Sequence, residues 1–264
     1  MSVEQLYRWQ SETALLEEAP AADASPVESP ILAADSWLVT DGSALALQLH
    51  RDRFLEAVHE MAPGITDAEA FWDAALATIP RTGAWFPRVQ VTHHNLTPQL
   101  SLLVRSAPER TKSVVVTSAT GPDPRQHPLV KGPDLERMSA LRASATREGA
   151  GEAVVLTTDG FVVEGAYSAL LWWRGQILCA PPLEFERIDS VTVRSVLALA
   201  AALGVETYQE AVTPAELEGT EVWALNALHG PRIVTEWVRG PGVAELPGRL
   251  TVWRTRLDAL RRPL

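Results

Sequence analysis

The chain has 264 residues, of which 46% are hydrophobic and 21% are charged, as in a globular protein that buries a core. Its 23 basic and 33 acidic residues give a formal net charge of −10. A chain this acidic repels a phosphate backbone, so nucleic acid is not expected as a partner. Cys179 is the only cysteine, which excludes an intrachain disulfide and a multi-cysteine metal site.

The first half of the sequence predicts a small mixed domain. A short aromatic strand at residues 7–9 precedes a Pro- and Ala-rich stretch, residues 17–26, that is too poor in large apolar residues to pack well. Asp41-Gly42 predicts the turn of a hairpin, and Thr66 is expected to cap a helix. Two helices are predicted over 50–61 and 67–79, and three strands over 88–92, 99–104 and 113–117.

A linker and a larger domain are predicted next. Residues 121–128 contain three prolines and one glycine, so we place the domain boundary there, between domains at 1–120 and 129–264. The basic residues of the last helix are expected to face solvent. Helices are predicted over 135–148, 193–203 and 250–260, and strands over 152–157, 161–164, 169–173, 176–179, 206–208, 221–225 and 233–238.

Two negative expectations follow from the same sequence. The N-terminus lacks a basic region followed by an apolar one, and no apolar run reaches the length of a membrane span. We therefore expect a cytoplasmic protein with no membrane partner. His93 and His94 are adjacent strand residues that point to opposite faces, so no metal site is predicted.

Lysine is scarce in this chain. It occurs only as Lys112 and Lys131, so a reaction that needs an amine nucleophile has two candidates. Lys112 stands in a polar segment, whereas Lys131 follows the linker and the apolar pair Leu129-Val130. This context favours Lys131 as a side chain at the mouth between two domains, and a solvated surface lysine is the alternative.

A set of motifs after Lys131 resembles the class IV aminotransferase family. The run Gly-Ala-Gly-Glu-Ala at 149–153 is similar to the family's Gly-Ala-Asp-Glu-Ala, and residues 159–165 repeat its Asp-Gly followed by Glu-Gly. Residues 190–192 stand where the family has Gly-Ile-Thr. Residues 226–230 resemble the Asn-Ala-Leu turn of aminodeoxychorismate lyases. The likeness covers nearly all of 129–240 and, more thinly, 35–105.

The resemblance implies a cofactor and a set of residues that hold it. The cofactor is pyridoxal 5'-phosphate, bound to Lys131 as a Schiff base, with Glu164 under the pyridine nitrogen. Arg53, in a His-x-x-Arg motif, and the helix start at 190–192 would bind the phosphate. The cofactor-binding set is Arg53, Lys131, Glu164, Ser190, Val191, Thr192, Asn226 and Ala227, and the catalytic residue is Lys131.

Simpler roles stay open for three of these positions. Glu164 can be a surface acid at a strand end, and Arg53 a solvated helix arginine. Residues 190–192 can serve only to cap a helix, although capping and phosphate binding are compatible. The sequence also departs from the family pattern at Ser168-Ala169, at Val193 and at Asp134-Leu135-Glu136 after the lysine.

The resemblance implies a two-domain α/β (α+β) protein of pyridoxal-phosphate fold type IV. It also implies a homodimer and a small amino acid or other amino-bearing substrate. The predicted activity is that of an aminotransferase, in which Lys131 moves the substrate's α-proton as general base. One alternative is a 4-amino-4-deoxychorismate lyase that releases pyruvate and 4-aminobenzoate, which the Asn226-Ala227-Leu228 turn favours. A second is a non-catalytic descendant that keeps the fold and binds a ligand.

Overall fold

The chain divides into two compact units, each described here by itself. The structure is a computed structural model that describes residues 4–19, 30–94 and 97–264. Unit 1 contains the described residues of 1–109 together with 130–135 and 260–264, and unit 2 contains 110–129 and 136–259. The boundary expected at 121–128 therefore falls inside unit 2, because the strand at 113–118 pairs with strands of the second half.

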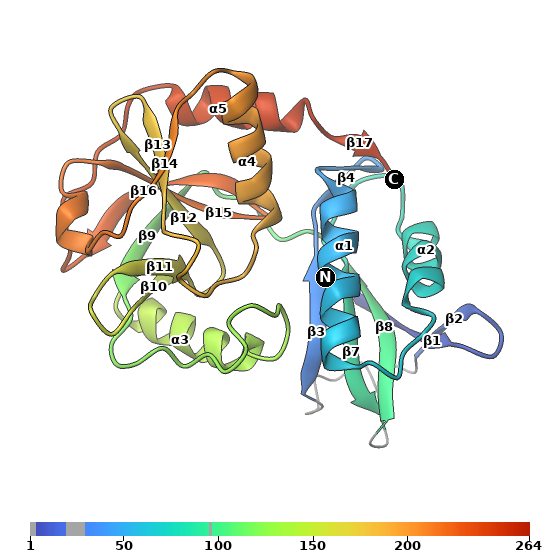
Figure 1. The fold of residues 1–264 in the computed structure, drawn as a ribbon. Helices are drawn as coiled ribbons and strands as arrows, with labels where there is room; N and C mark the ends of the chain where they lie inside the picture. The colour runs from blue at the N-terminus through green and yellow to red at the C-terminus, as the bar shows by residue number, and fades with distance from the viewer. Residues whose placement is uncertain (1–3, 20–29, 95–96) are drawn as a thin grey trace. The chain divides into compact units, whose positions relative to one another are not determined.

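Unit 1 is built on an antiparallel sheet (Figure 1). The strand order is β2-β1-β8-β7-β3, and α1 and α2 pack against this sheet. A smaller sheet has the order β17-β5-β4-β6 and joins the C-terminal residues to the Asp41-Gly42 hairpin. The elements are β1 (Glu4–Gln10), β2 (Leu15–Glu18), β3 (Ile31–Ser36), β4 (Val39–Thr40), β5 (Ser43–Ala44), α1 (Leu47–Met61), α2 (Ala68–Thr78), β6 (Ala84–Trp85), β7 (Arg88–His94), β8 (Thr97–Arg105) and β17 (Arg262–Pro263).

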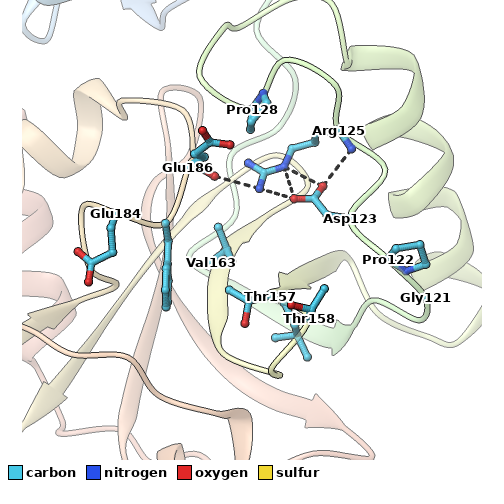
Figure 2. A pocket seen from close by; sticks show the side chains of 12 residues that line it. Gly121, Pro122, Asp123, Arg125, Pro128, Thr157, Thr158, Val163, Glu184 and Glu186 are labelled. Atoms are coloured by element: carbon cyan, nitrogen blue, oxygen red, sulfur yellow. Dashed lines mark hydrogen bonds and ion pairs between the residues drawn. The ribbon is translucent and has the colours of Figure 1, made fainter.

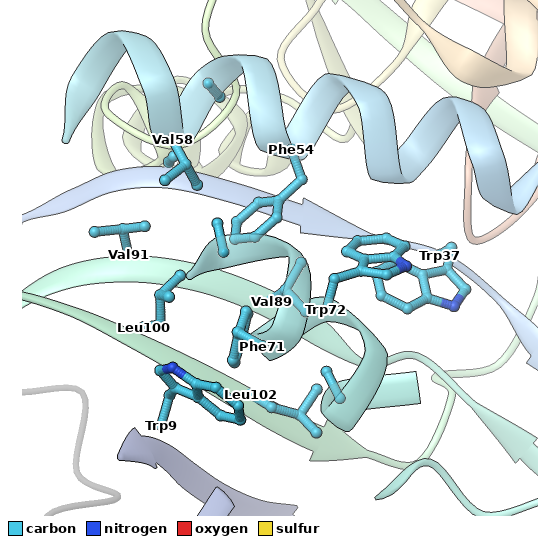
Figure 3. Packing of buried hydrophobic residues seen from close by; sticks show 14 of the residues in the cluster. Trp9, Trp37, Phe54, Val58, Phe71, Trp72, Val89, Val91, Leu100 and Leu102 are labelled. Atoms are coloured by element: carbon cyan, nitrogen blue, oxygen red, sulfur yellow. The ribbon is translucent and has the colours of Figure 1, made fainter. Parts of the chain in front are cut away.

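Apolar periodicity explains the core of unit 1 (Figure 3). Alternate residues of β7 and β8, such as Val89 and Leu102, are fully buried, as a strand with one face on the core requires. The helices bury Phe54 and Phe71 against them, with ring centroids 6.1 Å apart. Burying one such side chain contributes about 1.5–3 kcal/mol. This core fixes β3 against α1, which positions the buried charges described below.

Unit 2 contains a mixed sheet of eight strands with the order β11-β10-β9-β16-β15-β12-β13-β14 (Figure 1). Parallel pairs join β9 to β10 and β16, whereas β15 pairs antiparallel with both neighbours. The elements are β9 (Ser113–Ser118), α3 (Leu135–Arg147), β10 (Glu152–Leu156), β11 (Val162–Gly165), β12 (Ala169–Arg174), β13 (Ile177–Ala180), α4 (Val191–Ala202), β14 (Thr207–Gln209), η2 (Pro214–Leu217), β15 (Glu221–Asn226), β16 (Gly230–Val238) and α5 (Arg249–Asp258).

Three tryptophans join α5 to the sheet of unit 2. Trp253 meets Trp173 and Trp223 edge to face, with ring centroids 5.5 and 5.8 Å apart. Such pairs add about 0.5–1.5 kcal/mol to the burial of the rings. The last helix is therefore held to the sheet of unit 2 by aromatic packing.

Two local expectations differ from the structure. Asp67, not Thr66, occupies the N-cap position of α2, and its carboxylate accepts a hydrogen bond of 2.6 Å from Trp9 Nε1. The basic residues of the last helix are also not uniformly solvated, because Arg254 is half-buried and donates to the carbonyl of His229. Most of the Pro- and Ala-rich stretch at 17–26 lies outside the described residues.

Candidate functional site

Lys131 is anchored to strand β3 in unit 1. Its carbonyl accepts a hydrogen bond of 2.7 Å from the Ala34 amide. The next residue, Gly132, has φ +142°, and a Cβ there would lie 2.8 Å from Ala33 Cα. Only glycine permits this approach of two backbones. The main chain that carries the Lys131 amine is therefore fixed against the sheet.

A buried carboxylate organises the polar groups of α1. Asp35 is fully buried on β3 and accepts hydrogen bonds from Arg53 Nε (2.8 Å) and Arg53 Nη2 (2.9 Å), while its Oδ1 lies 2.8 Å from His50 Nδ1. Burial opposes ionisation of Asp35, but the charges of Arg53 and His50 hold its pKa well below the usual range. The two-point contact fixes the plane of the Arg53 guanidinium, so a solvated helix arginine is excluded.

His50 connects this network to Lys131. Burial lowers the pKa of His50, Asp35 opposes that shift, and the charges of Arg53 and Lys131 add to it. The Lys131 amine therefore lies within electrostatic reach of the His50 ring. Unit 1 thus brings together Lys131 and Arg53, the two cationic side chains expected to bind the cofactor.

Glu164 lies in unit 2, on β11, with its side chain 7% exposed. Its carboxylate contacts Arg125 Nη1, and the Arg125 side chain is itself only 4% exposed. Asp123 holds the same guanidinium through Arg125 Nη2 at 2.6 Å. Burial and pairing show that Glu164 is not a surface acid at a strand end.

Arg125 also lines a cavity of about 650 Å³ in unit 2 (Figure 2). Arg125 Nη2 donates to the Glu186 carbonyl at 3.0 Å, so one guanidinium connects the 121–128 segment, β11 and the loop after β13. The wall combines Pro122, Pro128 and Val163 with the acidic residues Glu184 and Glu186. Polar and apolar groups together suit a small charged organic molecule.

The start of α4 is a helix N-terminus capped by Ser190. Ser190 Oγ accepts a hydrogen bond of 3.3 Å from the Val193 amide, which confirms the capping role. Val191 and Thr192 form the buried first turn. The amides of a first helical turn and the helix dipole both favour an anion, so capping does not compete with phosphate binding.

The turn between β15 and β16 contains Asn226 and Ala227. Asn226 Oδ1 accepts from the His229 amide at 2.8 Å, and Asn226 Nδ2 donates to the Tyr167 carbonyl at 3.1 Å. Gly230, with φ +69°, closes the turn in a conformation that glycine adopts without strain. The Asn side chain therefore fixes the turn's backbone.

The predicted residues thus form two groups. Unit 1 holds Lys131 and Arg53, and unit 2 holds Glu164, Ser190, Val191, Thr192, Asn226 and Ala227. The sequence interpretation missed Asp35 and Arg125. The signal for Asp35 is a carboxylate directly after the apolar run 31–34, which needs a cation if that strand is buried. No sequence feature indicated that Arg125 is buried, because a Pro-rich segment is usually expected to be exposed to solvent.

The described residues contain no group of three or more side chains that could hold a metal ion. None of the helices in the same part of the chain has both the length and the apolar character needed to cross a bilayer.

The profile of the family described as "Amino-transferase class IV" matches residues 32–237. The chain belongs to this family. The match includes both groups of predicted residues, from Arg53 to Ala227. Membership confirms the family predicted from the sequence, and with it an enzyme that uses pyridoxal phosphate.

Solved structures agree with the fold of this class IV aminotransferase. A hypothetical aminotransferase from Mycobacterium tuberculosis in its PLP-bound form is 18% identical, with a TM-score of 0.81 and 98% of each chain covered. A fold IV-transaminase from Curtobacterium pusillum, CpuTA1, is 17% identical, with a TM-score of 0.77 and coverage of 97% and 96%. The branched-chain amino acid aminotransferase from Escherichia coli is 15% identical, with a TM-score of 0.78 and coverage of 97% and 94%. No curated protein matches the chain.

These similarities confirm the mixed α/β fold of type IV. At such low sequence identity they establish the fold alone, and the roles of individual residues depend on the chemistry of this chain.

Proposed function

We propose that this chain is a pyridoxal-phosphate-dependent aminotransferase that acts on a small amino acid or a related amine, with Lys131 as the amine that binds the cofactor. The observation that carries the proposal is the placement of Lys131. Its backbone is fixed against β3 at Ala34, next to the buried Asp35 that bonds Arg53. Lys112, the only other lysine, is exposed.

The donor set of the chain fits each functional group of pyridoxal phosphate. Lys131 offers an amine for the aldehyde. Glu164, buried and paired with Arg125, offers a carboxylate for the pyridine nitrogen. Arg53 and the first turn of α4 offer a guanidinium and backbone amides for the phosphate. Asn226 and Ala227 would add a second turn on the phosphate side.

When bound, pyridoxal phosphate supplies an electron sink for charge that develops at the substrate's α-carbon. The carboxylate of Glu164 would keep a proton on the pyridine nitrogen, and Arg125 orients that carboxylate. Lys131 Nζ would accept the α-proton as general base and would then donate it to the cofactor side rather than back to the α-carbon. Arg53, oriented by its two-point contact with Asp35, and the start of α4 would hold the phosphate in place.

A lyase that releases pyruvate from aminodeoxychorismate is the second candidate. The Asn226-Ala227-Leu228 turn favours it, since the carboxamide of Asn226 orders this backbone through bonds to His229 and Tyr167. The same residues serve both reactions up to removal of the α-proton. A pyruvate-release assay on aminodeoxychorismate, run beside a panel of amino donors, separates the two activities.

The test of the proposed function is covalent trapping at Lys131. Protein reconstituted with pyridoxal phosphate is treated with borohydride and digested, and mass spectrometry locates the pyridoxyl group. We expect the modification at Lys131, and we expect Lys131→Ala to lose both the modification and the visible absorbance band.

Lys112→Ala is the matched control, because it removes the other lysine from an exposed position. It is expected to retain the cofactor and the activity. A pyridoxyl group on Lys112, or no absorbance with added cofactor, would contradict the proposal and support a non-catalytic ligand-binding role. The homodimer and the cytoplasmic location belong to the same proposal, and sedimentation of the reconstituted protein measures the first.

A further inference from the structure

Two arginines of unit 2 converge on the turn between β15 and β16. Arg110 Nη2 and Arg254 Nη1 both donate to the His229 carbonyl, at 3.4 and 2.7 Å. A Cβ on Gly230 would lie 3.8 Å from each of these nitrogens. Arg110 precedes β9 and Arg254 lies on α5, so the fold holds two like charges side by side. Burial first, and then the charge of Arg110, lower the pKa of Arg254, while Asp258 opposes the shift.

Two further arginines extend this group. Arg232, on β16, has a side chain only 5% exposed, and its closest carboxylate oxygen is Glu152 Oε2 at 3.9 Å. Arg232 Nε has no hydrogen-bond partner among the described residues. Arg142, on the exposed side of α3, donates to the Gly151 carbonyl at 2.9 Å and lies over the Tyr167 ring at 5.3 Å. Guanidinium groups thus enter the cluster from four separate segments.

Glu152 is a poor counter-charge for this cluster. Its carboxylate already accepts hydrogen bonds from Ser168 Oγ at 2.6 Å and from the amides of Tyr167 and Ala153, each at 3.2 Å. Burial raises the pKa of Glu152, so the protein environment disfavours its negative charge. Arg232 therefore keeps hydrogen-bonding capacity that the buried carboxylate does not use.

The charges of these arginines affect the pKa of His229. Burial and the charges of Arg232, Arg142, Arg110 and Arg254 lower the pKa of His229 to about 4. The ring stays neutral, and its Nδ1 accepts a hydrogen bond of 3.1 Å from the Thr111 amide. The arginines repel one another, so an anion bound among them would be stabilised.

We propose that Arg110, Arg142, Arg232 and Arg254 form a binding site at the β15–β16 turn for a multiply charged oxyanion, such as a dicarboxylate or a phosphate. Guanidinium groups suit this role because they pair with carboxylate and phosphate oxygens in a forked geometry. None of the four belongs to the proposed cofactor-binding set, so the inference goes beyond the proposed function.

Calorimetric titration of the holoprotein with citrate and with inorganic phosphate, at low ionic strength, tests the site. We expect one anion per chain and an affinity roughly tenfold weaker in Arg142→Gln, since a hydrogen bond to a charged group is lost. Arg147→Gln, on the same helix, removes an exposed charge outside the cluster and is expected to bind as the parent does. Arg254→Gln provides a second variant if circular dichroism shows that it folds.

Three arms identify the source of the anion. Weaker binding of citrate together with a raised KM for a dicarboxylic amino donor indicates a substrate carboxylate. Weaker binding of inorganic phosphate alone indicates a free phosphate ligand. Absorbance titration with pyridoxal phosphate is the third arm: a parallel loss of cofactor affinity in Arg142→Gln would assign the arginines to the cofactor and overturn the inference. Absence of anion binding, or equal binding by Arg142→Gln, Arg254→Gln and Arg147→Gln, would overturn it as well.

Discussion

Two buried carboxylates, Asp35 beside Arg53 in unit 1 and Glu152 beside Arg232 in unit 2, differ in how closely they meet their arginine. In unit 1, Asp35 bonds Arg53 twice and also contacts His50, and all three contacts lie between 2.8 and 2.9 Å. In unit 2, Glu152 lies 3.9 Å from Arg232 and directs its oxygens to other donors. In unit 1 the carboxylate is closely paired with its arginine, whereas in unit 2 Arg232 has no carboxylate oxygen of a described residue at hydrogen-bonding distance.

The difference has a physical consequence for stability. Breaking a complete buried ion pair leaves an uncompensated charge, which is expensive. A buried pair whose charged atoms lie far apart contributes less to stability, because its weaker attraction offsets less of the free energy lost when both charges leave water. The two carboxylates should therefore respond very differently to the same conservative substitution.

The largest effect is expected from Asp35→Asn. This change leaves Arg53 buried without its anionic partner and should lower the free energy of unfolding by about 3–5 kcal/mol. Urea unfolding of the purified protein measures it. Asp52→Asn on α1 is the control, since its carboxylate is 44% exposed. If Asp35→Asn lowered the free energy of unfolding by less than Asp52→Asn does, the contacts of Asp35 with Arg53 and His50 would not stabilise unit 1 as proposed.

A smaller effect is expected from Glu152→Gln. The amide keeps the shape and an acceptor for Ser168, and burial already disfavours the charge of Glu152, which raises its pKa. We expect a loss of about 1 kcal/mol in the same unfolding assay. Glu236→Gln, at an exposed position of β16, is the control. A loss as large as that of Asp35→Asn would abolish the contrast between the two pairs.

The smallest effect concerns pH and His229. The pKa of His229 is lowered from 6.5 to about 4, first by burial and then by the neighbouring arginines. As the pH falls from about 6.5 towards 4, the unfolded chain takes up a proton on this ring and the folded chain does not, so stability decreases. His229→Gln should flatten this part of the stability curve by a few tenths of a kcal/mol at pH 6.5. Unfolding measured from pH 7 to 4.5 provides the comparison.

Anion binding should change the pKa of His229. Citrate in the arginine cluster would offset the positive field at His229 and raise the pKa of the ring, which nuclear magnetic resonance can follow. An unchanged titration of His229 in saturating citrate would place the bound anion away from the turn.

The amino-acid sequence by itself determined most of the secondary structure. The alternation in 88–92 and 99–104 and the helical spacing of Phe54 and Val58 match β7, β8 and α1, because local periodicity decides which face of an element is apolar. The motifs at 149–153, 159–165, 190–192 and 226–230, taken together, predicted the family. The domain boundary was harder to predict from the sequence, because β9 pairs in parallel with strands that lie far away along the chain.

Only the tertiary structure decided which charges meet. Asp35 and Arg53 are 18 residues apart, Arg125 and Glu164 are 39 apart, and Arg254 reaches His229 across 25 residues. An arginine on an amphipathic helix has the same local pattern whether it faces water or a buried carbonyl. Packing chooses between these outcomes, because long side chains find their partners through the geometry of the folded chain.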